Sequence, residues 1–265
     1  MNAPTHPIVA AELRRQIEVD GYAVVPLLDS NAVAEVRAVH ERFGPAPGDP
    51  RTGLFNDTWS TDPGYKRQVS GALSAILEPP ARTVCPEARF LGWTSIAKWA
   101  GPRGAVVAHR DPTFVDEPRV RSMAIWCALD DLDEAHGTLV VIPGSHRRAP
   151  NVRAHQDDAN LCPSVALDDP SAVTPVPVAA GDAIIYDHAL IHGSGPNRTG
   201  GVRTVVAGLA VPPDVVATYA LQVGEEVILV ELDADFFLEH KVDALDVDAV
   251  LEQHRIVRRL PPPPR

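Results

Sequence analysis

Apolar residues recur at helical spacing in the N-terminal part of the chain. The spacing predicts helices over residues 7–19, 30–43 and 65–77, because residues three and four positions apart share one face of a helix. The short β-branched run Tyr22–Pro26 between the first two segments predicts a strand. We therefore expect the helices that flank the core to lie mainly within residues 7–80.

Beyond residue 88 the pattern changes to short apolar runs that are separated by turn residues. Runs of this length and spacing are typical of strands in a β-sandwich or a β-barrel, which local periodicity does not distinguish. The runs lie at about 89–99, 121–129, 138–142, 183–187 and 203–211. We expect them to form a mainly β core over about 89–212.

Three further segments show how the chain is organised. Residues 44–64 are rich in Pro, Gly and Asp and include Phe55 and Trp59, which predicts a long ordered loop that either covers a site or only connects two elements. The polar, proline-rich stretch 148–175 predicts an insertion between strands. Residues 213–265 form a C-terminal extension without a usable motif, and we expect all 265 residues to form one domain.

Composition and charge narrow the classes of partner. Hydrophobic residues make up 45% and charged residues 22% of the chain, as is typical of a packed globular protein. A net charge of −11 disfavours nucleic acid and anionic membranes, because an acidic surface repels their phosphate groups. The chain shows no apolar stretch of about 20 residues and no leader pattern, so we expect a cytoplasmic protein. No heptad pattern marks a partner surface, and we expect a monomer or a homodimer.

His109-Arg-Asp111 places an imidazole and a carboxylate two residues apart, and in an extended segment such side chains point to the same face. Two ligands from one strand and a third from a distant strand would occupy one face of an octahedral metal and leave positions open. The pattern alone is a weak signal, because most histidines are merely packed or solvated. It gains weight only from the residues that follow downstream.

The segment Gly181–Asn197 contains the candidate third ligand. A Gly-Asp turn opens a β-branched strand that is predicted to end in His192, before a glycine-rich turn. In a continuous strand with a rise of about 3.3 Å per residue, His188 would lie roughly 13 Å from His192 and would not share its metal. A helix would instead bring His188 and His192 together.

Arg203 begins a strand whose alternation groups its side chain with Val205, Ala207 and Leu209. If that face is interior, the buried guanidinium needs an anionic partner, which a dicarboxylate co-substrate or an internal Asp or Glu would provide. In the run 121–129, Trp126 shares a face with small residues, so it either lines a cavity or fills the core.

Several short motifs follow one another along the chain. They are His109-Arg-Asp111, Ala124–Asp131, Gly137–His146, Gly181-Asp182, and His192–Asn197 followed by Arg203. In order and spacing they resemble the phytanoyl-CoA dioxygenase family over roughly residues 10–212. The resemblance implies a mainly β protein with flanking helices, whose core is a double-stranded β-helix, also called a jelly roll or cupin-like fold.

The resemblance also implies the chemistry of the site. Iron(II) would be held by His109, Asp111 and His192, with 2-oxoglutarate and O2 as co-substrates. Arg203 would bind the distal carboxylate of 2-oxoglutarate, assisted by Ser194, and Trp126 would line that pocket. The implied activity is hydroxylation of an unactivated C–H bond of a small molecule, with secondary metabolism as one setting. Similar halogenases replace the carboxylate by a small residue, so Asp111 favours hydroxylation.

Two other functions are compatible with the same residues. Two histidines and a carboxylate also hold zinc in hydrolases, although the chain has no H-E-x-x-H motif. A jelly roll can also bind a metal or a ligand without turnover, because a fold alone does not prove activity. The identity of the small-molecule substrate is not readable from the sequence.

Overall fold

The computed structural model describes residues 6, 8–44, 53–149, 152–155, 162, 165–167, 169 and 171–261 of the chain. Two antiparallel sheets form the centre of this part. The larger sheet has the strand order β1-β8-β5-β10-β3-β2 and the smaller one β4-β9-β6-β7. From β3 to β10 the chain passes back and forth between the two sheets, with β6 and β7 together in the smaller one, which is the arrangement of a jelly roll. The predicted mainly β fold with flanking helices is therefore confirmed.

The strands of the larger sheet agree closely with the predicted runs, except for β2, which was not predicted. They are β1 (Tyr22–Pro26), β2 (Leu54–Asn56), β3 (Arg89–Lys98), β5 (Met123–Ala128), β8 (Asp182–Asp187) and β10 (Arg203–Val211). The smaller sheet consists of β4 (Val106–His109), β6 (Leu139–Val141), β7 (Thr174–Pro175) and β9 (His192–Ser194). The strands β4, β7 and β9 have two to four residues, too few for an alternating pattern to reveal them.

The two faces of the larger sheet bury different sets of residues. In β5, Met123, Ile125 and Cys127 join an apolar cluster with the helices, whereas Ala124 and Trp126 join a second cluster that includes strand residues of the smaller sheet. Successive side chains of a strand point to opposite faces, so β5 contributes to both clusters. The face of Trp126 is thus the interior of the jelly roll.

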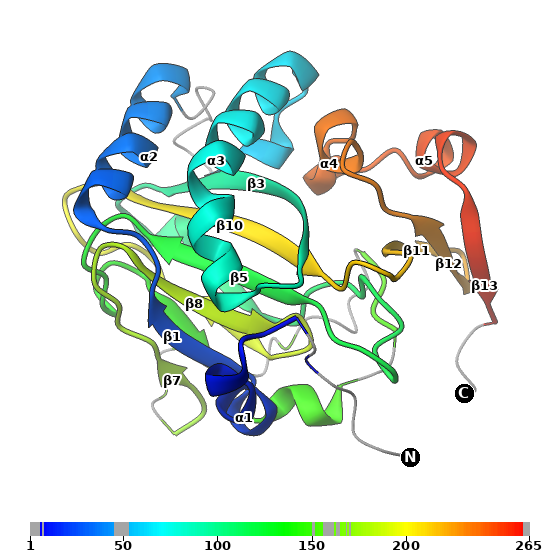
Figure 1. Cartoon of the computed structure of the whole chain (residues 1–265), viewed down its shortest axis with the longest axis horizontal. Coiled ribbons are helices and arrows are strands. Elements are labelled where there is room, and N and C mark those ends of the chain that lie inside the picture. The colour runs from blue at the N-terminus through cyan, green and yellow to red at the C-terminus, as the bar shows by residue number, and fades with distance from the viewer. Residues whose placement is uncertain are drawn as a thin grey trace.

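Three helices flank the sheets: α1 (Ala11–Asp20), α2 (Ser30–Phe43) and α3 (Pro63–Val84). Figure 1 shows α2 and α3 side by side over the outer face of the larger sheet. The predicted start of the first helix at residue 7 is wrong, because the Ala10 N–H pairs with the Val84 carbonyl oxygen instead of continuing a helix. The third helix runs past Leu77, since buried contacts of its last turns outweigh the cost of Pro79 and Pro80.

The predicted long loop 44–64 is only partly a loop. Residues 45–52 lie outside the described part, but Leu54–Asn56 form β2 at the edge of the larger sheet, and a 3₁₀ turn follows at Asp57–Trp59. Strand β2 pairs with β3, and this long-range pairing is not visible in a local sequence pattern.

The C-terminal extension forms a third, antiparallel sheet of β11 (Thr218–Val223), β12 (Glu226–Glu231) and β13 (Ile256–Leu260), with the short helices α4 (Phe236–Glu239) and α5 (Val247–Gln253). It lies at one side of the molecule, coloured orange to red in Figure 1. Its buried residues share an apolar cluster with Phe114 and Leu209 of the jelly roll. Among the described residues, no helix has the length and apolar character needed to cross a membrane.

Gly181 lies in the turn before β8 and packs against the segment that follows β1. Its φ is +91°, and a Cβ atom placed on it would lie 2.3 Å from the Leu28 carbonyl oxygen. Its own carbonyl oxygen accepts hydrogen bonds from the N–H groups of Leu27 and Leu28. We expect Gly181→Ala to lower the free energy of unfolding by roughly 2–4 kcal/mol, from left-handed backbone strain plus the clash.

Urea denaturation measures this loss. Gly200→Ala is the matched control, because an added Cβ there meets open space, and its unfolding midpoint should stay near that of the wild type. Equal midpoints for both variants would contradict the role given to Gly181.

Candidate active site

Strands β4 and β9 pair so that His109 stands directly opposite His192. Asp111 follows β4 by two residues, and its N–H donates to the His188 carbonyl oxygen at 3.0 Å. One Asp111 oxygen, Oδ1, lies 3.6 Å from His109 Nε2 and 3.8 Å from His192 Nε2. Potential ligand atoms of these three residues lie within 4.8 Å of one another. The structure thus brings together the three residues that the sequence singled out.

Backbone carbonyls fix the orientation of both histidine rings. His109 Nδ1 lies 2.9 Å from the Val107 carbonyl oxygen, and His192 Nδ1 lies 3.1 Å from that of Leu190. Since a carbonyl oxygen only accepts, both Nδ1 atoms carry a proton, and Nε2 is the atom of each neutral ring that can bind a metal. Outer hydrogen bonds of this kind hold histidines in metal sites.

The local environment favours an ionised Asp111 and a neutral His192. For His109, burial lowers the pKa, but the hydrogen bond and charge of Asp111 outweigh burial and raise it. Burial lowers the pKa of His192 to about 4. Burial also raises the pKa of Asp111, but the charge of His192 and the hydrogen bond from His109 outweigh it and hold that pKa well below its usual range. At neutral pH the carboxylate is therefore ionised and His192 is neutral, which is the state that a metal requires of its ligands.

The predicted continuous strand up to His192 is wrong. Strand β8 ends at Asp187, a turn follows over 188–190, and β9 begins at His192. The turn brings His188 to the same cavity as His192, so the distance argument against it as a ligand does not apply. His188 still lies outside the group of three, and its Nδ1 is 2.9 Å from the Ser122 hydroxyl.

Arg203 begins β10 and is buried, with 4% of its surface exposed. Its Nη1 donates to the Gly137 carbonyl oxygen at 3.0 Å, and its guanidinium carbon lies 5.4 Å from the Trp126 ring centre. Within the described part of the chain, no carboxylate forms an ion pair with Arg203, and its Nε has no hydrogen-bond partner. Burial lowers the pKa of Arg203 to about 9, so the side chain stays a cation at neutral pH.

Lys98 is a second buried basic residue, which the sequence did not single out. It stands opposite Arg203 in the pairing of β3 with β10, and it is fully buried. Its Nζ donates to the Ser194 hydroxyl and to the Gly195 carbonyl oxygen, both at 2.6 Å. Burial, helped by the charge of Arg203, lowers the pKa of Lys98 to about 6. The sequence did contain one signal for this residue, because a lysine within a run that is predicted to be a buried strand is unusual.

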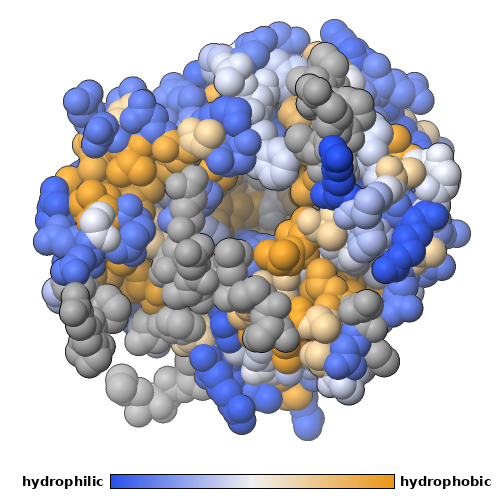
Figure 2. All heavy atoms as spheres, turned by 180° about the vertical axis from the view of Figure 1, so that it is seen from behind, coloured by the Kyte–Doolittle hydropathy of each residue, from blue (hydrophilic) through white to orange (hydrophobic). Residues whose placement is uncertain are grey.

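A cavity of about 470 Å³ connects these residues. The three grouped residues line it together with Trp126, Ser194 and Arg203, so every predicted site residue faces one space. The face shown in Figure 2 is hollowed near its centre, with apolar residues at depth and both polar and apolar residues around the rim. The wall also includes Asn56, whose Oδ1 accepts from Thr58 and Thr94, leaving its amide N–H groups without a partner in the described residues.

A chain of buried charges supports the backbone next to the site. Arg153 Nε donates to the Asp111 carbonyl oxygen at 2.7 Å, and its Nη atoms bind both Glu117 oxygens at 2.6 Å. Arg121 bridges Glu117 and Asp187, and Asp187 lies 3.0 Å from His6 Nε2. These contacts tie residue 6 to the segment that carries Asp111.

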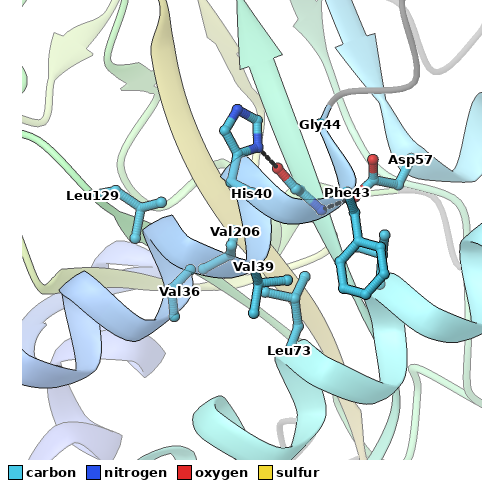
Figure 3. Close-up of a pocket in the computed structure, with 11 residues that line it drawn as sticks. Val36, Val39, His40, Phe43, Gly44, Asp57, Leu73, Leu129 and Val206 are labelled. Carbon is cyan, nitrogen blue, oxygen red and sulfur yellow. Dashed lines mark hydrogen bonds between the residues drawn. The ribbon is translucent and has the colours of Figure 1, made fainter.

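A second, much smaller cavity lies on the outer side of the larger sheet, beneath α2 and α3 (Figure 3). Its volume of about 10 Å³ suits one water molecule. Asp57 lines both cavities, and its oxygens accept from the Tyr65 hydroxyl at 2.6 Å and from the Ser95 N–H at 2.7 Å. The Ser95 hydroxyl lies 3.2 Å from His40 Nδ1.

A jelly roll whose interior presents two histidines and one carboxylate defines the scaffold and donor set of mononuclear non-haem iron oxygenases. The model of the phytanoyl-CoA dioxygenase family matches residues 11–205 of this chain. The chain belongs to that family, and the resemblance drawn from the sequence is confirmed.

Parts of this chain are also similar in sequence to curated members of the same family. The chain is 34% identical to phytanoyl-CoA dioxygenase 1 of Oryza sativa subsp. japonica over 139 residues, 51% of this chain and 48% of that protein. It is 33% identical over 119 residues to phytanoyl-CoA dioxygenase domain-containing protein 1 of Danio rerio, covering 42% of this chain and 40% of that protein. The chain thus spans about half the length, or less, of these curated relatives.

Solved structures share the fold. HygX from Streptomyces hygroscopicus, crystallised with nickel, 2-oxoglutarate and hygromycin B, aligns with a TM-score of 0.56 at 20% identity, over 78% of this chain and 88% of HygX. At this level of identity the likeness establishes the jelly-roll fold alone.

The buried ion pairs predict a large effect of Glu117 on stability. Glu117→Gln would leave Arg153 and Arg121 buried beside a neutral side chain, so we expect unfolding to become easier by about 3–5 kcal/mol. Glu134→Gln, at an exposed carboxylate, is the control and should change stability by less than about 0.5 kcal/mol. Thermal and urea unfolding measure both, and a wild-type stability for Glu117→Gln would show that the ion pairs are dispensable.

Proposed function

We propose that this protein is a 2-oxoglutarate-dependent non-haem iron dioxygenase that oxidises an unactivated C–H bond of a small molecule. One observation carries the proposal: the cavity that holds the histidine–carboxylate group also contains a buried arginine with no carboxylate partner among the described residues. A zinc hydrolase would use His109, Asp111 and His192 but would not explain why Arg203 is buried without a carboxylate partner. A metal-bound dicarboxylate co-substrate would explain both the metal group and the buried arginine.

The residues fit the two groups. His109 Nε2, His192 Nε2 and an Asp111 oxygen would hold iron(II), and Arg203 would bind the distal carboxylate of 2-oxoglutarate. Ser194, whose hydroxyl accepts from Lys98, would assist at that carboxylate, and Trp126 would form the wall beside it. When bound, iron(II) and 2-oxoglutarate supply O2-dependent C–H oxidation, with 2-oxoglutarate consumed to succinate and CO2.

The protein itself would orient the metal ligands and the substrate and would keep water out of the site. The carbonyls of Val107 and Leu190 keep both imidazoles in one tautomer, so their lone pairs stay directed away from the backbone. The Tyr186 hydroxyl lies 3.4 Å from His192 Nε2 and lines the same cavity. The largely apolar wall limits water around the reacting C–H bond and holds the substrate in one orientation.

The structural neighbours support a small-molecule substrate. HygX holds hygromycin B together with 2-oxoglutarate, and EvdO2 from Micromonospora carbonacea var. aurantiaca, which holds 2-oxoglutarate, aligns with a TM-score of 0.57 at 21% identity, over 76% of this chain and 90% of EvdO2. Secondary metabolism is accordingly the setting that we propose. We also propose that the 265 residues form one domain, because the cavity takes side chains from both the family-matched part and the C-terminal extension. A cytoplasmic location and a monomer or homodimer stay predictions.

Arg203→Met tests the co-substrate assignment. Hydrogen bonds to a charged group contribute about 1.5–3 kcal/mol, so we expect the affinity for 2-oxoglutarate to fall by about 100-fold. The measurement is an anaerobic titration of iron(II)-loaded protein with 2-oxoglutarate, followed by the visible charge-transfer band of the complex. Arg198→Met removes an exposed arginine five positions away and should leave the titration unchanged.

Two outcomes would count against the proposal. Equal affinities in wild type and Arg203→Met would remove Arg203 from the co-substrate site. No band in the wild type despite bound metal would favour the zinc hydrolase or the binding protein.

Asp111→Ala tests the metal site separately. Loss of an outer partner of a metal ligand typically weakens binding 10–100-fold, so we expect loss of the ligand itself to weaken iron(II) binding by about 100-fold or more. The Asp111 side chain is partly exposed, and the melting temperature should change little. Metal affinity is measured by competition with a chelator, with Asp116→Ala, at an exposed carboxylate, as the control. Unchanged affinity in Asp111→Ala would exclude this carboxylate as a ligand.

A further inference from the structure

Part of the cavity wall lies outside the jelly-roll strands that carry the metal group. Trp59 of the 3₁₀ turn and Lys66 of α3 line this part, together with Tyr219, Phe237 and Val242 of the C-terminal extension. The extension lies beyond residue 205, where the family match ends. Of these five side chains, Lys66 is the one that carries a charge.

Lys66 is a buried cation with an incomplete set of partners. Only 3% of its surface is exposed, and its Nζ donates to the His240 carbonyl oxygen at 2.8 Å. An ammonium group has three N–H donors, and within the described residues Lys66 makes no second hydrogen bond and no ion pair. Burial lowers the pKa of Lys66 to about 8, so it is still mostly charged at pH 7. A buried charge of this kind is costly unless an anion accompanies it.

The buried carboxyl group of Asp57 does not serve as the anionic partner of Lys66. Both oxygens of Asp57 already accept hydrogen bonds, one from the Tyr65 hydroxyl and one from the Ser95 N–H. Burial also raises the pKa of Asp57 to about 6, which weakens its charge near neutral pH. Asp57 forms no ion pair with Lys66.

The packing of α4 against α3 does not explain why the charged side chain of Lys66 is buried either. The next residue, Arg67, is about half exposed and pairs with Asp235 at 2.8 Å and with Glu239 at 3.2 Å. These surface pairs already link the two helices. The buried side chain of Lys66 instead lines the cavity, and its unused N–H donors have no acceptor in the described part of the chain.

We propose that Lys66 binds an oxyanion group, such as a carboxylate, sulfate or phosphate, of the substrate, whose apolar part lies against Trp59 and Phe237. This inference rests on the proposed function, because it assigns Arg203 to 2-oxoglutarate and leaves Lys66 to the substrate. Specificity for a negatively charged, largely apolar small molecule then comes from α3 and the C-terminal extension, and the chemistry comes from the jelly roll.

A pair of fluorescent probes tests this assignment without knowledge of the substrate. 8-Anilinonaphthalene-1-sulfonate and N-phenyl-1-naphthylamine have the same ring system, and only the first carries an anionic group. The dissociation constants of both probes are measured by fluorescence enhancement on the full chain, without iron(II) or 2-oxoglutarate. The readout is the ratio of the two constants, which reports the contribution of the sulfonate.

We expect Lys66→Met to reduce the preference for the sulfonate at least tenfold. Lys66→Gln, which keeps a donor for the His240 carbonyl oxygen but removes the charge, should do the same and guards against a folding defect. Arg67→Met is the matched control for the contact between α3 and α4 and should keep the wild-type preference. Arg203→Met is measured alongside, because it shows whether the sulfonate binds at the co-substrate arginine instead.

An unchanged preference in both Lys66 variants would overturn the proposal. A preference lost in Arg67→Met as much as in Lys66→Met would assign the effect to docking of α4, and one lost only in Arg203→Met would place the anion at Arg203. These results do not depend on the charge-transfer titration. A failed titration with a positive probe result would leave an anion-binding cavity and remove only the oxygenase function.

Discussion

The pairing of β4 with β9 is the constraint on which the site depends. It sets His109 opposite His192, and the carbonyls two residues before each histidine fix the tautomer of its ring. Because these contacts are made by the backbone, they hold the two nitrogens in place before any metal binds. Asp111 completes the group from the segment beyond β4, where Arg153 holds its carbonyl oxygen. The pairing of β4 with β9 therefore sets the positions of two of the three candidate metal ligands.

The distribution of charge gives the molecule an unusual interior. The chain as a whole carries a net charge of −11, yet Arg203 and Lys66 are buried cations that line the cavity. Within the described residues, neither of them forms an ion pair with a carboxylate. Carbonyl oxygens stabilise them only in part, so the interior favours anions while the surface repels them. Selection of anionic ligands therefore takes place inside the cavity.

The sequence predicted what depends on short stretches of chain and missed what depends on distant pairing. The long strands were predicted because alternation is local. The three grouped residues were predicted because the motifs that carry them resemble those of the phytanoyl-CoA dioxygenase family. The turn after β8 was missed because Ile184 and Ile185 favour a strand without showing where it ends. Lys98 was missed because its importance comes from standing opposite Arg203. The C-terminal extension carries no motif, and its place in the cavity wall follows only from packing.

The order of strands in the larger sheet also determines how the chain must fold. Strand β1 pairs with β8, some 160 residues later, and His6 reaches Asp187 across 181 positions. Such distant contacts require closure of large loops before they stabilise anything, which slows folding. During synthesis the first strand therefore has no partner until most of the chain has emerged. Its exposed edge in that interval makes β1 the segment with the greatest tendency to aggregate in a nascent or truncated chain.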